Sequence, residues 1–113
     1  MNKMYYYNAH VTGVYDGDTI TCNIDCGFGI ILKKQKIRLY GINTPELRGD
    51  DKINGIKARD YLRKLILDKD IILETYKNNK KCKYGRWLGI IHIDDININN
   101  KLIDEKYAVA VQY

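Results

Sequence analysis

Short runs of β-branched and aliphatic residues, each ended by turn residues, recur through most of this chain. They cover residues 9–15, 18–23, 30–40, 70–75 and 86–93. Runs of this length and composition are typical of β-strands. Asp16-Gly17 joins the first two runs as a hairpin turn, for which positive φ angles are expected. In the third run Ile37 and Leu39 share one face, so Arg38 is expected on the other.

Helical periodicity appears in two segments. Residues 54–67 predict an amphipathic helix, and its apolar stripe consists of Ile56, Tyr61, Leu62, Leu65 and Ile66. Residues 100–107 predict a second, short helix. The order of three strands, a helix, two strands and a short helix predicts a mainly β fold with α (α+β). The specific expectation is a five-stranded barrel of the oligonucleotide-binding (OB-fold) type, with the longer helix between strands 3 and 4.

Pro45 is the only proline of the chain and follows the third run by a few residues. Proline lacks a backbone donor and restricts the residue before it to extended conformations. We therefore expect Pro45 to end the third strand and to hold Thr44 extended.

Length and charge limit the classes of function. A chain of 113 residues is expected to form a single domain over residues 1–113. Its formal net charge of +5 and pI near 9.0 indicate attraction to polyanions, nucleic acid first. The alternative is that a surplus of lysines only keeps a small domain in solution. No signal peptide or membrane span is visible, so we expect an intracellular protein without a membrane partner, with secretion only if a leader was removed. We also expect a monomer.

Two of the three cysteines, Cys22 and Cys26, fall within or just after one predicted strand. Four strand steps separate their Cα atoms by about 13 Å, which is too far for a disulfide. A reduced setting is expected, and no histidine lies near enough in sequence to suggest a zinc site.

Polar side chains gather where predicted strands begin and end, and hairpins between the first three strands would bring them together. They are Asp18, Arg38, Asn43, Thr44, Glu46 and Arg86. Guanidinium groups and a hard cation stabilise the negative charge that develops during phosphodiester cleavage. A carboxylate can accept a proton from an attacking water. Each residue alone also has a simpler reading as a turn, loop or solvated strand residue.

Three ordered motifs together are more specific: DGDT at 16–19, RLYGINTPE at 38–46 and KYGRWLG at 83–89. In this order they resemble the staphylococcal nuclease (thermonuclease-like) family, over about residues 11–113. The resemblance implies an OB-fold barrel that cleaves DNA and RNA with one Ca²⁺ ion.

The resemblance also implies roles for individual residues. Asp18, Asn43 and the backbone carbonyl of Thr44 match metal ligands. Arg38 and Arg86 match phosphate-binding arginines, and Glu46 matches the general base or water-orienting acid. Three further residues match nucleotide contacts: Lys83, Tyr84 and, by a looser alignment, Tyr113.

Asn43 departs from the family, which usually has an aspartate ligand at this position. An amide oxygen carries no charge, and the charge of the ligands tunes calcium affinity. Metal binding is therefore expected to be weak. The alternative to a nuclease is a nucleic-acid-binding module with an eroded metal site. A folding or assembly module is a third reading, which explains the barrel but not the clustered charges.

Overall fold

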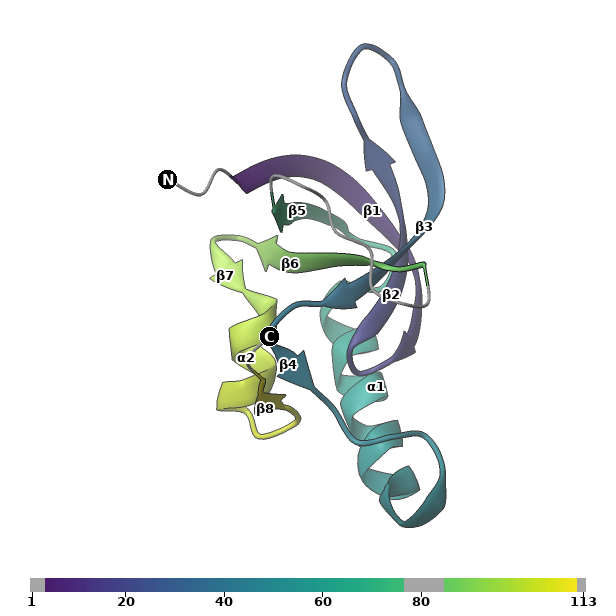
Figure 1. Cartoon of the computed structure of the whole chain (residues 1–113), viewed down its shortest axis with the longest axis vertical. Helices are drawn as coiled ribbons and strands as arrows, with labels where there is room; N and C mark the ends of the chain where they lie inside the picture. Colours follow the sequence, from purple (N-terminus) through teal and green to yellow (C-terminus); the bar gives the residue numbers. More distant parts are fainter. Residues whose placement is uncertain (1–3, 77–84, 112–113) are drawn as a thin grey trace.

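The computed structural model describes residues 4–76 and 85–111, which form a closed β-barrel with two helices (Figure 1). The barrel strands are β1 (Met4–Asp16), β2 (Thr19–Asp25), β3 (Ile31–Leu39), β5 (Asp70–Tyr76) and β6 (Trp87–Ile93). Antiparallel neighbours follow the order β3-β2-β1-β5-β6, and a parallel pairing of β3 with β6 closes the ring. The predicted five-stranded barrel is confirmed.

Closure depends on a bend in β1 and on a close approach at β6. β1 pairs with β5 through its first half and with β2 through its second half. Register shifts between Val11 and Gly13 and between Val14 and Asp16 bend the strand, as β-bulges do. At Gly89 an added Cβ would lie 2.7 Å from Leu73 Cδ1, so a side chain here would require the buried Leu73 to shift.

The barrel interior holds the aliphatic core. Its largest fully buried side chains include Val11, Ile20, Cys22, Ile37, Leu39, Leu73 and Ile91. Ile37 and Leu39 are buried while Arg38 is only partly so, which confirms the predicted alternation along β3. The outer face at the end of β3 is therefore free to carry polar chemistry.

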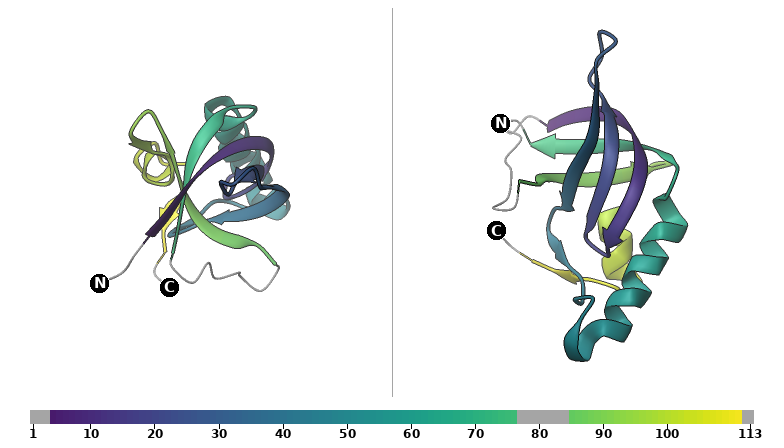
Figure 2. Two further views of the ribbon diagram at one scale, coloured as in Figure 1. Left: turned by 90° about the horizontal axis from the view of Figure 1, so that it is seen from above. Right: turned by 90° about the vertical axis from the view of Figure 1, so that its right-hand side faces the viewer.

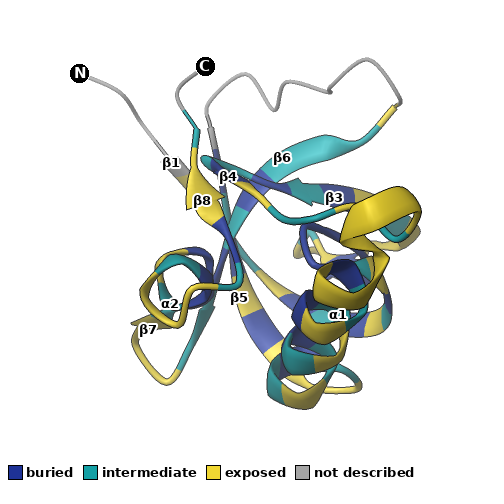
Figure 3. Ribbon diagram, turned by 90° about the horizontal axis from the view of Figure 1, so that it is seen from below, coloured by how far each residue is buried: buried dark blue, intermediate teal, exposed yellow. Residues whose placement is uncertain are grey.

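The helix α1 (Lys52–Ile66) lies across the end of the barrel where β1 turns into β2 (Figure 2). Its buried residues are Gly55, Ala58, Leu62 and Ile66, spaced as one face of a helix. Its outer face is exposed (Figure 3). The predicted helix is confirmed, with Leu62 and Ile66 of its stripe buried and Tyr61 and Leu65 packed partly buried against the core. The small residues Gly55 and Ala58 complete the buried face. Ile56 is only half-buried.

The shorter elements differ more from expectation. A 3-10 turn, η1 (Gly49–Asp51), precedes α1. The second helix, α2 (Ile98–Asp104), begins and ends earlier than predicted. Asn97 caps it by accepting a hydrogen bond from the backbone N–H of Asn100, and Lys106, at φ 67°, follows its end. The short β7 (Ile96–Asn97) pairs with β6, and β4 (Ile42–Asn43) pairs with β8 (Val109–Ala110).

Two expectations about turns were wrong. Pro45 does not end β3, because β3 stops at Leu39 and Gly41 turns the chain with a φ of 81°. The β1–β2 hairpin is present, but neither Asp16 nor Gly17 has a positive φ. Gly17 is needed for a different reason, which is packing around the candidate site.

Within the described residues, no helix is long and apolar enough to cross a membrane. Cys22 and Cys26 are free thiols, as expected from their spacing. Burial raises the pKa of the Cys22 thiol to about 12.

Candidate nuclease site

Asp18 stands just before β2 and is almost completely buried, with 8% of its surface exposed. Its backbone carbonyl accepts a hydrogen bond of 2.8 Å from the N–H of Leu39. Its Oδ2 atom accepts a hydrogen bond of 3.1 Å from the N–H of Thr44. The β1–β2 turn, the end of β3 and the segment before Pro45 thus meet at one residue, Asp18, as the predicted hairpin order requires.

Arg38 faces this carboxylate from β3, where it pairs with Thr19 across the β2–β3 ladder. Its Nη2 atom lies 3.4 Å from Asp18 Oδ2 and also donates to Asn43 Oδ1. Its Nη1 atom donates to the Leu39 carbonyl at 2.8 Å. Only 12% of either side chain of the Arg38–Asp18 pair is exposed, so solvent screens this ion pair little.

Gly17 lets the turn pack against two other elements of the site. An added Cβ would lie 2.8 Å from Thr44 Oγ1 and 2.9 Å from Ala58 Cβ. Contacts this short do not occur for real Cβ atoms, so the turn is held between Thr44 and α1 only because residue 17 has no side chain. This packing fixes the distance between Asp18 and the Thr44 backbone.

Arg86 reaches the same cluster through Thr19. Its Nη1 atom donates to Thr19 Oγ1 at 3.2 Å, and the Thr19 hydroxyl also contacts Asp18 Oδ1 at 3.3 Å. The two arginines, which are far apart in sequence, therefore approach Asp18 and its neighbour Thr19 from β3 and from the start of β6.

Glu46 lies beside this cluster without a direct contact to it among the described hydrogen bonds. Its side chain is exposed and lines a surface depression together with Tyr15, Asp16, Leu47 and Arg48. Asp16 links the depression to the cluster, because its Oδ1 atom accepts a hydrogen bond of 3.0 Å from the Asp18 N–H.

The environment of Asp16 disfavours its charged form. Burial, followed by the hydrogen bond to the Asp18 side chain and the repulsion from its charge, raises the pKa of Asp16 to about 6. A cation placed near both carboxylates would relieve the repulsion that acts on Asp16.

The backbone at Pro45–Glu46 is packed tightly against α1. A Cβ added to Gly55 would lie 2.2 Å from the Glu46 carbonyl oxygen and 2.9 Å from that of Pro45. Gly55 therefore allows the first turns of α1 to touch the segment that carries Glu46. The position of that segment depends on a helix packing contact as well as on Pro45.

The structure thus brings together Asp18, Arg38, Asn43, the Thr44 backbone and Arg86, with Glu46 on the adjoining depression. Lys83, Tyr84 and Tyr113 lie outside the described residues. Asp16 and Thr19 belong to the arrangement but were not among the predicted site residues. The signal for both was present in the DGDT motif, where a second acid and a hydroxyl flank Asp18.

The donors in this arrangement suit a hard cation and a phosphate. They are all oxygen atoms, from carboxylates and the Asn43 amide, which favours calcium or magnesium over softer metals. In the part of the chain that the structure describes, no three His, Cys, Asp or Glu side chains group as a metal site. These oxygen ligands are of the type that Ca²⁺ or Mg²⁺ prefers, but together they carry little negative charge. Two guanidinium groups beside them offer hydrogen-bond donors to a phosphodiester.

A comparison with protein families finds a match over residues 36–113 to the model described as "Staphylococcal nuclease homologue". The matched segment contains Arg38, Asn43, Glu46 and Arg86.

Three curated proteins are similar in sequence. The chain is 30% identical to the uncharacterized protein MJ1439 of Methanocaldococcus jannaschii, over 91% of this chain and 58% of that protein. It is 32% identical to "Endonuclease YhcR" of Bacillus subtilis, over 90% of this chain and 9% of that protein. It is 31% identical to an uncharacterized protein of Bacillus anthracis, over 88% of this chain and 45% of that protein. This chain thus spans less than two thirds of the length of each of these relatives.

Proposed function

Because this chain belongs to the staphylococcal nuclease homologue family, we propose that it is a Ca²⁺-dependent phosphodiesterase that hydrolyses DNA, preferably single-stranded, and RNA as a second substrate. The observation that carries the proposal is the buried Asp18–Arg38 pair, with Asn43, Thr44 and Arg86 around it. A buried ion pair rarely repays its desolvation as a stabilising device. The position of this pair among phosphate-binding candidates at the end of β3 favours a role in binding.

The two arginines have complementary tasks in this mechanism. Arg38 and Arg86 bind the non-bridging oxygens of the scissile phosphate, and the charge that develops there in the transition state strengthens these contacts. Arg38 is anchored to the Leu39 carbonyl and Asp18, so its guanidinium is already oriented before the substrate arrives. Preorganised donors avoid a reorganisation cost at the moment of reaction.

The acids position the remaining groups. Asp18, Asn43 and the Thr44 carbonyl would hold one Ca²⁺ ion, which supplies positive charge that polarises the phosphate when bound. Glu46, exposed on the adjoining depression, accepts or orients the proton of the attacking water. All these contacts go to phosphate or water, so little base specificity is expected.

The neutral ligand Asn43 lowers the affinity for calcium. The site lacks one negative charge that an aspartate would supply, and ligand charge count sets calcium affinity. Half-maximal activity is therefore expected at a calcium concentration about one to two orders of magnitude above that of an Asn43→Asp variant.

A binding module is the second candidate, because Arg38 already donates to Asn43 and pairs with Asp18. In a binding module, Arg38 would occupy Asp18 and Asn43 in place of a metal ion, and the same face would bind nucleic acid without cleaving it.

The deciding experiment is cleavage of a fluorescent single-stranded DNA across a calcium titration, with duplex DNA and RNA in parallel. Wild type, Asn43→Asp and Glu46→Gln are compared. The proposal predicts cleavage by wild type, a lower calcium requirement for Asn43→Asp, and a loss of about 100-fold or more for Glu46→Gln.

Binding of the same oligonucleotide is measured by fluorescence anisotropy. Binding without cleavage at saturating calcium would reject the nuclease and favour the binding module. Cleavage that persists in Glu46→Gln would keep the nuclease and remove Glu46 as its base.

A further inference from the structure

The hairpin between β2 and β3 projects well beyond the barrel (Figures 1 and 2). Its end, residues 26–32 with the sequence CGFGIIL, contains no charged residue. Phe28 is fully exposed at 101%, and Ile30, Ile31 and Leu32 are 53%, 47% and 44% exposed. We call residues 26–32 the hairpin tip. Contiguous exposed apolar side chains of this kind mark interaction sites.

The backbone of the hairpin tip is built to present Phe28 outward. Gly27, Phe28 and Gly29 all have positive φ angles, of 80°, 57° and 75°. A bulky residue rarely adopts this conformation, and such strain concentrates where function requires it. Hydrogen bonds of 2.8 Å from Cys26 N to Ile30 O and of 2.9 Å from Gly27 N to Asp25 Oδ1 close the turn.

Positive charge follows directly behind the apolar residues. Lys33, Lys34 and Lys36 are exposed on β3. The N–H of Lys34 is bonded to Asn23 Oδ1 at 2.9 Å, which fixes the strand at its local irregularity. The nearest acid on the hairpin is Asp25, and its carboxylate accepts a hydrogen bond from the N–H of Gly27. The hairpin thus carries an apolar end and a cationic layer behind it.

We propose that the hairpin tip is an anchor for an anionic lipid surface. Phe28, Ile30 and Ile31 enter the boundary between headgroups and acyl chains, and the three lysines pair with anionic headgroups. Such an anchor would lie at the membrane interface without spanning it, so it is compatible with the absence of a membrane-spanning helix among the described residues. The proposal differs from the expectation of no membrane partner, which rested on spanning segments alone.

The shape and charge of the hairpin favour lipid over a second copy of this chain. Contact between two hairpin tips would bring the two lysine layers together, in a protein whose net charge is already +5. A projecting, convex hairpin end can also enter a fluid lipid layer more easily than it can match the surface of a rigid protein partner.

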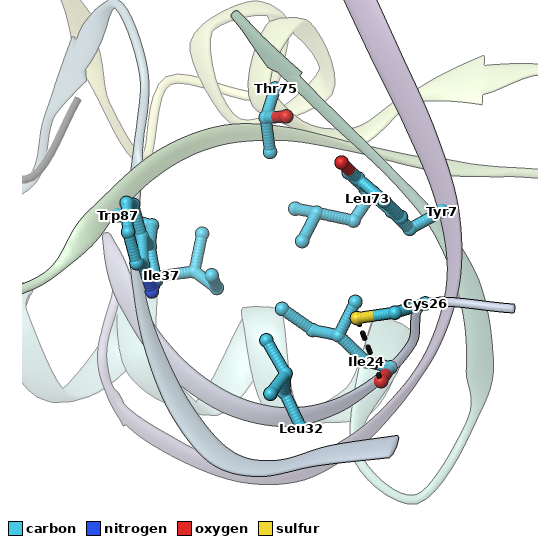
Figure 4. A pocket seen from close by; sticks show the side chains of 8 residues that line it. All are labelled: Tyr7, Ile24, Cys26, Leu32, Ile37, Leu73, Thr75 and Trp87. Atoms are coloured by element: carbon cyan, nitrogen blue, oxygen red, sulfur yellow. Dashed lines mark hydrogen bonds between the residues drawn. The ribbon is translucent and has the colours of Figure 1, made fainter. Parts of the chain in front are cut away.

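An apolar pocket at the open end of the barrel is the one feature that favours a second copy. Its volume is about 90 Å³, and its lining includes Cys26, Leu32 and Trp87 (Figure 4). Insertion of Phe28 from a second copy into this pocket is the competing outcome. The test below separates this outcome from lipid binding.

An anchored hairpin tip leaves the candidate nuclease site accessible. The tip joins the end of β2 to the start of β3, whereas Asp18 and Arg38 lie at the opposite ends of these strands. The length of β2 alone separates the two by about 20 Å. A membrane-bound molecule would therefore present its candidate nuclease site to the aqueous side.

The test is sedimentation of the protein with phosphatidylcholine vesicles, with and without phosphatidylglycerol, at low and high salt. Wild type should bind only the anionic vesicles, and less at high salt. Phe28→Asn should weaken binding roughly tenfold or more. Asparagine tolerates positive φ, so this variant keeps the turn. Lys33→Gln should weaken binding about fivefold.

Ile53→Gln and Lys64→Gln on α1 are matched controls, because both residues are exposed and lie away from the hairpin. Both should bind like wild type. Absence of wild-type binding to anionic vesicles, or equal binding by Phe28→Asn, overturns the proposal. A dimer in analytical ultracentrifugation that Phe28→Asn abolishes, without lipid binding, assigns the tip to contact between copies and equally overturns it.

Discussion

Asp16 and Asp18 stand on either side of Gly17, and a hydrogen bond to the Asp18 side chain and the repulsion from its charge both act on Asp16. Asp18 is compensated by Arg38 and by the Thr44 N–H. Among the described residues, no ion pair is seen for Asp16, and burial, followed by the hydrogen bond to Asp18 and the repulsion from its charge, raises the pKa of Asp16 to about 6. At the residue scale, the two neighbouring acids differ because Asp18 is paired with Arg38, whereas the surroundings of Asp16 disfavour its charged form.

This difference predicts a pH-dependent stability for the metal-free protein. The ordinary pKa of Asp16 is 3.8 and its folded pKa is about 6, so the folded state binds more protons between these values. The contribution of Asp16 to the free energy of unfolding therefore falls as pH rises from about 4 to about 6. Asp16→Asn should remove most of this pH dependence and should stabilise the protein at pH 7. Urea denaturation in a chelator, at a series of pH values, measures the effect.

Asp50→Asn is the control, because Asp50 is an exposed acid of η1. It should retain the wild-type pH dependence. An Asp16→Asn variant with the same pH profile as wild type would show that Asp16 does not titrate as described.

At the element scale, the close packing of α1 against the Pro45–Glu46 segment decides which residue occupies position 55. The helix propensity of that residue matters less. Glycine is a poor residue inside a helix, and alanine is normally more stable there by about 1 kcal/mol. Gly55 nevertheless sits within α1, because the Glu46 carbonyl occupies the space where a Cβ would be.

We therefore predict that Gly55→Ala destabilises the protein by roughly 1–3 kcal/mol, against its helix propensity. The displaced segment carries Glu46, so the cleavage rate under the proposed function should fall as well. Thermal denaturation and single-stranded DNA cleavage measure the two effects.

Gly13→Ala is the matched control, because the nearest side-chain atom to its new Cβ would be 3.7 Å away, an ordinary contact. It should cost much less stability than Gly55→Ala. Equal costs for the two variants would contradict the packing argument.

At the scale of the whole molecule, one buried side chain ties the second helix to the closure of the barrel. Asn99 on α2 is 2% exposed. Its Nδ2 atom donates to the carbonyls of Tyr40 and Gly89 at 2.9 and 3.2 Å, and its Oδ1 atom accepts from Ile91 N at 3.2 Å. These bonds join the chain just after β3 to β6, next to their parallel pairing.

Replacement of Asn99 by alanine would leave the Tyr40 carbonyl and the Ile91 N–H without this partner in a buried setting. We expect a loss of about 3 kcal/mol in the free energy of unfolding, measured by chemical denaturation. Asn100→Ala removes an exposed neighbouring amide and should change stability by less than about 0.5 kcal/mol. A small effect of Asn99→Ala would show that water replaces these bonds at little cost.

Much of the architecture was predictable because it depends on local periodicity. Alternation along β3 placed Ile37 and Leu39 inside and Arg38 outside, and the helical stripe placed Leu62 and Ile66 against the barrel. The order of these elements was sufficient to predict the barrel. The motifs DGDT and RLYGINTPE likewise indicated which end of the strands would carry the charged groups.

Other features were decided only in three dimensions. Gly17 and Gly55 are required by close approaches to Thr44, Ala58 and the Glu46 carbonyl, which no local pattern encodes. The pairing of β4 with β8 and the bond from Arg86 to Thr19 join residues distant in sequence. The amino-acid sequence by itself determined the barrel class and indicated the residues that we propose to bind phosphate. The tertiary structure decided which of them meet, because contacts between distant residues depend on strand register, barrel closure and packing.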